Sequence, residues 1–438
     1  MNTNNNSIDA SQLIDERPMS RTQVLVAALC AVAILIDGYG LQVMALTVPT
    51  LAHEWGMSPA RFSVALSAVL FGLGASAAVV APLGDKLGRR PMVLVAMLII
   101  GMATLATATA TNPTQFVIWR FLTGFGIGIS VPNCNAWTAE YSPARRRSTI
   151  LVLINAAVGV GAFSAGYIVP PVLEHWGWRG TFVIGGAVSL LLAVVMFLTA
   201  PESVKLLLSR ERRDVRIAAI LKRIAPGVDP ERVRHGTGER RAVRRSVLEL
   251  LGTVYRARTL VLWSLIAVNL FTLYVLISWL PTLLQAAGWQ LAQAVRAAVL
   301  IQAGGVIGGI VLSFSLDRGQ TRPALFGAFL IAAACLALFG AVPSGAGWSA
   351  MLLLIGCGVS GPQLSLNALA TAYYPPAIKA TGMAWAGVVG TVGSIIAPLA
   401  GGQIIEAGFT PVTILVALSL GPVVCAGGVL LMRREWQE

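Results

Sequence analysis

The sequence predicts an all-α polytopic membrane protein, with twelve membrane-spanning helices arranged as two pseudo-symmetric bundles of six. Three observations lead to this prediction. Of the 438 residues, 56% are hydrophobic and 12% are charged, whereas soluble domains carry about 25% charged residues. Apolar runs of roughly 20 residues, long enough to cross a bilayer as a helix, recur from Val24 to Leu431. Short sequence landmarks are also repeated, once in each half of the chain.

The apolar runs define the order of the elements. A polar tail, 1–23, precedes the first span, and it lacks the basic segment followed by an apolar segment that marks a signal peptide. An arginine-rich connection, 200–258, separates the six-helix bundle of 24–199 from that of 259–432, and a short tail, 433–438, ends the chain. The predicted spans are 24–49, 60–83, 91–111, 113–136, 148–172, 180–199, 259–286, 291–316, 322–341, 347–372, 379–405 and 410–432.

The basic residues predict the orientation of these spans. Of the 32 lysines and arginines, 28 lie in the two tails and the connections on their side of the membrane, three lie in the opposite connections, and Arg120 lies within a span. Basic residues accumulate in cytoplasmic loops, so we expect both termini and the central loop to be cytoplasmic. The same bias accounts for the net charge of +13, and we expect no nucleic-acid partner.

Two landmarks indicate an internal duplication. GDKLGRR (84–90) follows the second span and LDRGQTR (316–322) the eighth, with Asp85 and Asp317 232 positions apart. YSPARRRST (141–149) and YPPAIKAT (374–381) follow the fourth and tenth spans, with Tyr141 and Tyr374 233 positions apart. Units of six spans insert in the same orientation, which is typical of transporters whose substrate site lies between the halves near the membrane midplane.

The basic turn after the second span predicts a gating loop. Gly88 permits a tight turn, Asp85 can meet a helix N-terminus, and Arg89 and Arg90 can pair with acids or lipid headgroups. Together with Asp317 and Arg318 of the second copy, such a cluster would form a latch that breaks when the halves rock. The alternative is that these residues only determine topology.

Two charged residues are predicted to lie well inside the membrane, Asp37 and Arg120. Charges at this depth cost roughly 2.5–3.5 kcal/mol on insertion scales and usually mark ion pathways or proton relays. A carboxyl group withdrawn from water binds a proton more readily, and a nearby arginine opposes this. Asp37 is therefore the candidate proton carrier, with Arg120 as its modulator. The alternative is an ion pair that locks the first span to the fourth.

Neutral polar side chains within the spans are candidate substrate contacts. Each has the alternative role of an interhelical hydrogen bond or a packing contact. With Asp37 and Arg120, the candidate substrate-binding residues are Tyr39, Gln42, Asn133, Asn269, Tyr274, Gln302, Trp385 and Thr391. We find no cysteine or histidine spacing typical of a metal site, no P-loop and no catalytic constellation, so the sequence predicts neither a metal, a cofactor nor an enzyme.

Several motifs resemble those of the major facilitator superfamily. These are APLGDKLGRR (81–90), WRFLTGFGIG (119–128), which contains Arg120, and PESVKLLL (201–208). Within it, the chain resembles the aromatic acid:proton symporters in RPMSRTQ followed by DGYGLQ, VPNCNAWTAEYSPARRR (131–147), WGWRGTFVIGG (176–186), YVLISWLPTLL (274–284) and KATGMAWAGVVGTVGS (379–394). The resemblance implies uptake of benzoate-like or hydroxybenzoate-like anions with protons, by alternating access, across a bacterial cytoplasmic membrane.

The chain departs from the pattern of that family at two positions. The first-span motif usually carries a second acid where this chain has Gly40, and a span-eleven arginine is replaced by Thr391. The resemblance thus leaves the identity of the acid open. We expect a monomeric importer of an aromatic or related organic acid with protons. The alternatives are a proton antiporter that exports aromatic or hydrophobic compounds, and a sensor built on a transporter fold.

Overall fold

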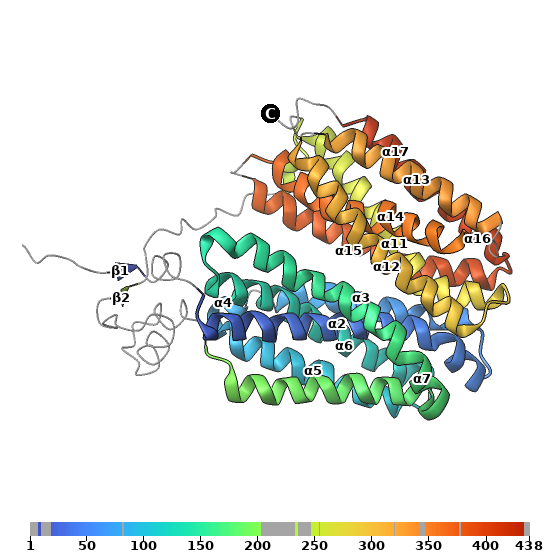
Figure 1. Cartoon of the computed structure of the whole chain (residues 1–438), viewed down its shortest axis with the longest axis horizontal. Coiled ribbons are helices and arrows are strands. Elements are labelled where there is room, and N and C mark those ends of the chain that lie inside the picture. Colours follow the sequence, from blue (N-terminus) through green and yellow to red (C-terminus); the bar gives the residue numbers. More distant parts are fainter. Residues whose placement is uncertain are drawn as a thin grey trace, which may run out of the picture.

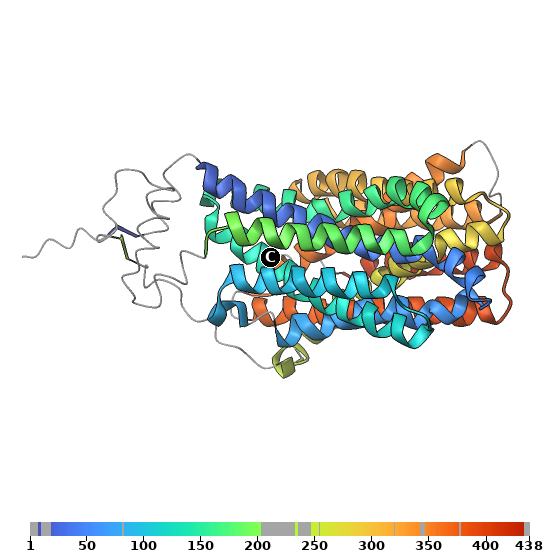
Figure 2. The ribbon, with the colours of Figure 1, turned by 90° about the horizontal axis from the view of Figure 1, so that it is seen from below.

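The computed structural model describes residues 8–9, 19–80, 83–202, 233–234, 247–253, 255–318, 320–341, 347–375 and 378–432. Most of the two predicted tails and of the central connection lie outside the described residues. The helices run along the long axis of the molecule (Figures 1 and 2), and in Figure 1 those of the N-terminal half lie on one side and those of the C-terminal half on the other.

The elements follow the predicted order. In the N-terminal half they are β1 (Ile8–Asp9), α2 (Arg21–Glu54), η1 (Pro59–Phe62), α3 (Ser63–Val79), α4 (Gly84–Leu87), α5 (Arg89–Ala108), α6 (Pro113–Tyr141) and α7 (Ala144–Thr199). They continue with β2 (Val233–Arg234), α10 (Val247–Leu250), α11 (Arg256–Ala286), α12 (Leu291–Asp317), α13 (Thr321–Ala341), α14 (Trp348–Tyr373), α15 (Lys379–Glu406), α16 (Pro411–Leu418) and α17 (Leu420–Leu430). The two-residue strands β1 and β2 pair in parallel.

Eleven helices in the described part of the chain are long and apolar enough to cross a membrane. One of them, α7, contains two of the predicted spans. The bend between these two spans is at Gly177, whose backbone has φ 65° and ψ −174°. This left-handed conformation is accessible to glycine and reverses the chain direction there. The described helices therefore make the twelve predicted crossings. The main difference lies in α2, which extends beyond the predicted span at both ends.

Local sequence signals place the helix ends. Ser20 begins α2 with a capping box: its side chain accepts from the Gln23 amide, and the Gln23 side chain accepts from the Ser20 amide at 2.6 Å. Asn112 caps α6 directly before Pro113, a residue that suits the first helical turn. Between α4 and α5, Gly88 has φ 116°, which confirms the predicted tight turn.

Close helix contacts repeat in the two halves with a spacing of 232 residues. At each contact a Cβ added to a glycine would meet backbone of a neighbouring helix, so the glycine allows the two helices to approach. The pairs are Gly72 with Phe121 and Gly304 with Leu353, Gly124 with Val69 and Gly356 with Ile301, and Gly161 with Leu35 and Gly393 with Ala267. The predicted duplication is thus present in the packing of the helices as well as in the sequence.

The two halves share an apolar core at one end of the molecule. We call the end that contains η1 the η1 end, and the opposite end, which contains α4, the α4 end. The largest apolar cluster lies toward the η1 end and joins residues of both halves, such as Val43 and Leu280. Toward the α4 end, the described apolar clusters are separate, and each belongs to one half. Among the described residues, the apolar core that joins the halves thus lies toward the η1 end, and contacts between the halves reach mid-helix at Gly74 with Thr391 and at Gly159 with Val306.

Candidate functional site

Asp37 lies near the middle of α2 and is buried, with 1% of its surface exposed. Neither carboxylate oxygen has a hydrogen-bond partner in the described structure. The polar side chain beside it is Ser130 of α6, although no hydrogen bond of standard geometry joins the two. The Ser130 hydroxyl in turn lies 3.9 Å from the Cys134 thiol. An acid without a partner at this depth is costly to retain, so packing alone does not explain why this position carries a carboxylate.

Arg120 is also fully buried, and its Nε and Nη2 are held by other groups, whereas its Nη1 has no hydrogen-bond partner in the described structure. Its Nη2 donates to Thr123 Oγ1 at 2.8 Å and to Thr104 Oγ1 at 3.4 Å, and its Nε donates to Thr107 Oγ1 at 3.3 Å. The guanidinium lies 4.9 Å from the centre of the Phe182 ring. These contacts connect α6 with α5 and with the second part of α7.

The structure does not bring Arg120 next to Asp37. Ten residues of α6 separate Arg120 from Ser130, which is a rise of about 15 Å along the helix. Arg120 lies toward the η1 end, whereas Asp37 lies at the level of Ser130. Neither the predicted locking ion pair nor direct modulation of Asp37 by Arg120 is present in this conformation.

The remaining N-terminal candidates have different surroundings. The Tyr39 hydroxyl donates to the Thr181 carbonyl at 2.9 Å, a contact between helices. Gln42 is buried, and its Nε2 has no partner in the described structure. Asn133 lies at the α4 end, where its Oδ1 accepts from Arg89 Nη1 at 3.4 Å. Of these three, Gln42 is the residue whose buried side-chain nitrogen has no partner in the described structure.

In the C-terminal half the structure joins Asn269 to a residue that sequence reasoning missed. Asn269 of α11 is 2% exposed, and its Nδ2 donates to Gln363 Oε1 of α14 at 2.9 Å. Gln363 Nε2 donates to Asn367 Oδ1 at 3.4 Å. Gln363 could have been found from the internal repeat, since it lies 233 positions after Ser130.

The other C-terminal candidates do not join this group through described hydrogen bonds. Tyr274 is half-buried and packs against the apolar core shared by the halves, and Gln302 is half-buried on α12. Trp385 is 40% exposed and stacks on Trp263, with ring centres 6.3 Å apart. For Tyr274 and Trp385 the contacts favour packing roles, and none of the described hydrogen bonds involves Gln302.

The two positions that depart from the family pattern lie in different places. Thr391 of α15 faces α3: its Cγ2 atom would lie 2.8 Å from a Cβ on Gly74, and its hydroxyl donates to the Gly387 carbonyl. Thr391 is therefore part of the contact between the halves. A Cβ on Gly40 would have no atom within 4 Å, so there is open space at the position where the family pattern usually carries a second acid.

The predicted gating loop forms contacts inside the N-terminal half. Arg89 Nε lies 3.2 Å from Glu140 Oε1, and Arg90 Nη2 donates to the Phe197 carbonyl at the end of α7. Arg322, 232 positions after Arg90, donates likewise to the Leu430 carbonyl at the end of α17, so the repeat extends to this contact. Arg318 is exposed, and the side chains of Asp85 and Asp317 lie outside the described part of the structure.

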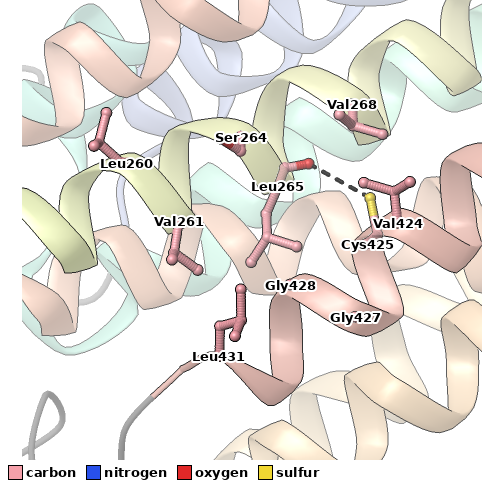
Figure 3. Close-up of a pocket in the computed structure, with 10 residues that line it drawn as sticks. All are labelled: Leu260, Val261, Ser264, Leu265, Val268, Val424, Cys425, Gly427, Gly428 and Leu431. Carbon is pink, nitrogen blue, oxygen red and sulfur yellow. Dashed lines mark hydrogen bonds between the residues drawn. The ribbon is translucent and has the colours of Figure 1, made fainter.

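A cavity of about 520 Å³ lies between α11 and α17, but it does not contain the candidate site. Apolar side chains and two glycines, Gly427 and Gly428, line it, and Ser264 is its polar side chain (Figure 3). Leu431 and Val424 at its rim are 66% and 58% exposed. In a membrane helix bundle such a surface faces lipid, and none of the predicted substrate-binding residues lines this cavity.

Comparison with known proteins identifies the family. The sequence profile of the Major Facilitator Superfamily matches residues 30–434. This chain belongs to the major facilitator superfamily. Membership confirms the predicted fold, and it makes the chain a multi-pass membrane transporter rather than an enzyme.

Its relatives include transporters of aromatic acids. The gallate transporter of Pseudomonas putida is 33% identical over 92% of this chain and 90% of its own. The 4-hydroxybenzoate transporter PcaK of the same organism is 33% identical over 97% and 96%, and the benzoate transport protein of Acinetobacter baylyi is 27% identical over 91% and 87%.

Solved structures with the same fold include inward-facing transporters. A bacterial homologue of the human lysosomal transporter Spinster, inward-facing and occupied, has a TM-score of 0.73 at 16% identity and covers 94% of this chain and 97% of its own. The inward-open xylose transporter XylE of Escherichia coli has a TM-score of 0.71 at 17% identity, over 93% and 96%. Both likenesses concern the fold alone.

Proposed function

We propose that this protein is a proton-coupled secondary transporter that imports an aromatic or related organic acid by alternating access, with Asp37 as the proton carrier. The observation that carries the proposal is the unpartnered, buried carboxylate of Asp37 at mid-membrane. A carboxyl group in this setting is neutral with a proton bound and costly without one. The substrate class is supported by relatives that carry gallate, 4-hydroxybenzoate and benzoate.

The proposed orientation puts the α4 end in the cytoplasm of a bacterial cell. The basic residues of the loops at that end support it through the positive-inside rule. With the halves packed at the η1 end, the structure corresponds in this proposal to an inward-facing state. Import then requires a second state, in which the η1 end opens and the α4 end closes.

The proposal gives Arg120 and the gating loop separate roles. Arg120 holds α5, α6 and α7 together through three threonines and Phe182, so that the bundle rocks as one body. Arg89 and Glu140 form an ion pair that would rearrange when the α4 end closes.

Transport by purified protein in liposomes tests the proposal. Labelled 4-hydroxybenzoate, gallate and benzoate are offered outside, with an imposed inward proton gradient. Uphill accumulation that collapses with the gradient is expected for the wild type. Export driven by the opposite gradient would favour an antiporter, and binding without flux would favour a sensor.

Two matched variants isolate the carrier. Asp37→Asn removes the exchangeable proton and is expected to abolish uphill accumulation while downhill exchange of substrate continues. Glu54→Gln makes the same chemical change at an exposed acid that pairs with Arg179 and should accumulate substrate like the wild type. Accumulation by Asp37→Asn at the wild-type level would remove Asp37 as the carrier.

A further inference from the structure

Asp37 and Ser130 have structural counterparts in the C-terminal half. Asn269 follows Asp37 by 232 positions, the spacing that relates the glycine contacts and the arginine contacts of the two halves, and Gln363 follows Ser130 by 233, the spacing of Tyr141 and Tyr374. α11 and α14 are the repeats of α2 and α6. The fold therefore places the acid Asp37 and the hydroxyl of Ser130 in the N-terminal half where the C-terminal half has the side-chain amides of Asn269 and Gln363.

The amides form a row that leads from a buried residue to an exposed one. Asn269 is buried, Gln363 is half-buried and Asn367, one turn further along α14, is exposed. Asn269 donates to Gln363 and Gln363 donates to Asn367, so all donor–acceptor pairs run in one direction. A primary amide has two N–H donors. Asn269 and Gln363 each use one of theirs, and the described contacts leave the Asn367 N–H groups without a partner.

An acid anion inside the protein needs hydrogen-bond donors. Arg120 contacts three threonines and Phe182 through Nε, Nη2 and the face of its guanidinium, and its Nη1 has no described partner. It lies about 15 Å along α6 from Ser130, the counterpart of Gln363. Position 391 carries a threonine whose hydroxyl already donates to a backbone carbonyl. The free N–H groups of Asn269, Gln363 and Asn367, which we call the amide row, can donate to a carboxylate without any charged side chain. Hydrogen bonds to a charged acceptor are stronger than those between neutral groups.

We propose that Gln363 and Asn367, positioned by Asn269, bind the carboxylate of the transported acid. Binding by the C-terminal half and proton transfer by Asp37 of the N-terminal half then occur on opposite sides of the interface between the bundles. This inference rests on the proposed function for the substrate class, and it names Gln363 as a residue that determines affinity.

Binding measurements on purified protein test the assignment. Calorimetry with 4-hydroxybenzoate and benzoate is performed on the wild type, on Gln363→Leu and on Gln403→Leu. Gln403 is exposed toward the η1 end of α15 and provides the same substitution away from the amide row. Loss of hydrogen bonds to a carboxylate is expected to weaken binding by Gln363→Leu about 10- to 100-fold, with Gln403→Leu unchanged.

A charged variant separates binding from folding. Gln363→Glu keeps the size of the side chain and places a negative charge beside the carboxylate. It is expected to lose affinity for benzoate while it binds the neutral analogue benzamide as the wild type does. A purely structural role of Gln363 would weaken both ligands equally, and that result would overturn the inference.

The outcomes also distinguish this inference from the proposed function. If the wild type neither binds nor transports any aromatic acid, the proposed function fails. If the wild type binds the acids and both Gln363 variants bind them equally well, only the amide-row assignment fails. Size-exclusion profiles and melting temperatures of each variant establish that the protein compared is folded.

Discussion

Gly166 of α7 and Val299 of α12 meet where the two halves touch, and a disulfide introduced there should trap the conformation described above. A Cβ on Gly166 would lie 3.7 Å from the Val299 Cβ, and disulfides join Cβ atoms about 3.5–4.5 Å apart. The same Cβ would overlap a methyl group of Val299. Because Val299→Cys removes that methyl, the double variant should be better tolerated than a single substitution at Gly166.

The bond would prevent the η1 end from opening. Once the disulfide forms, the two Cβ atoms cannot separate beyond about 4.5 Å, whereas alternating access requires α7 and α12 to part there. Uphill uptake should fall to background on oxidation and return on reduction. Substrate binding should persist, because the bond leaves the α4 end unconstrained.

The assay requires proof that the bond has formed. In a background with the five native cysteines replaced by alanine, a protease site is inserted into the segment 203–232, which connects the halves. After cleavage, the fragments should migrate together on a gel without reductant and separately with it, whereas both single-cysteine variants should always separate. Complete crosslinking with unchanged uptake would refute the idea that opening at the η1 end is part of the transport cycle.

Four further substitutions test helix packing, the role of Arg120 and substrate specificity. Gly124→Val should reduce the free energy of unfolding by about 1–3 kcal/mol or more, because its Cβ would meet backbone of α3. Gly40→Ala has open space around the new methyl group and should be neutral or stabilising by up to about 1 kcal/mol. Equal melting temperatures of these two variants would contradict the prediction. Arg120→Lys loses the forked contacts to the threonines and should cost about 1–3 kcal/mol with substrate affinity retained, and a large loss of affinity would instead support a substrate contact. Thr391→Arg restores a cation and should shift preference toward small benzoates in competition uptake, where an unchanged profile would show that this position does not set specificity.

Much of the fold could be predicted because a bilayer imposes strong local constraints. Every span must supply about 20 apolar residues and satisfy its own backbone, so apolar runs and basic loops indicate number and order. Asp37 was predicted from its position in such a run. The two spans within α7, which meet at Gly177, and the last span, which is interrupted at Ser419 between α16 and α17, were still predicted in the correct number. The length and hydropathy of a span do not depend on how its helix ends.

The relation between Asp37 and Arg120 shows the limit of that reasoning. Both residues lie well inside apolar runs. Arg120, however, lies near the η1 end of α6, whereas Asp37 lies near the middle of α2. The helical rise from the ends of the two predicted spans to Asp37 and to Arg120 would have indicated that the two residues lie at different depths in the membrane. The three threonines around Arg120 could not have been found in this way, because two of them belong to another helix and the rotation of each helix about its axis is not encoded locally.

From the sequence alone we could predict a chain that crosses a membrane in two repeats of six helices, with Asp37 well inside the first predicted span. Composition and periodicity suffice for this, because lipid acts on each span separately. Only the tertiary structure decided which polar side chains meet. It left Asp37 without a partner, enclosed Arg120, joined Asn269 to Gln363 and packed the halves together at one end. These contacts depend on close approaches between helices distant in sequence, made possible by glycines whose partners lie on other helices.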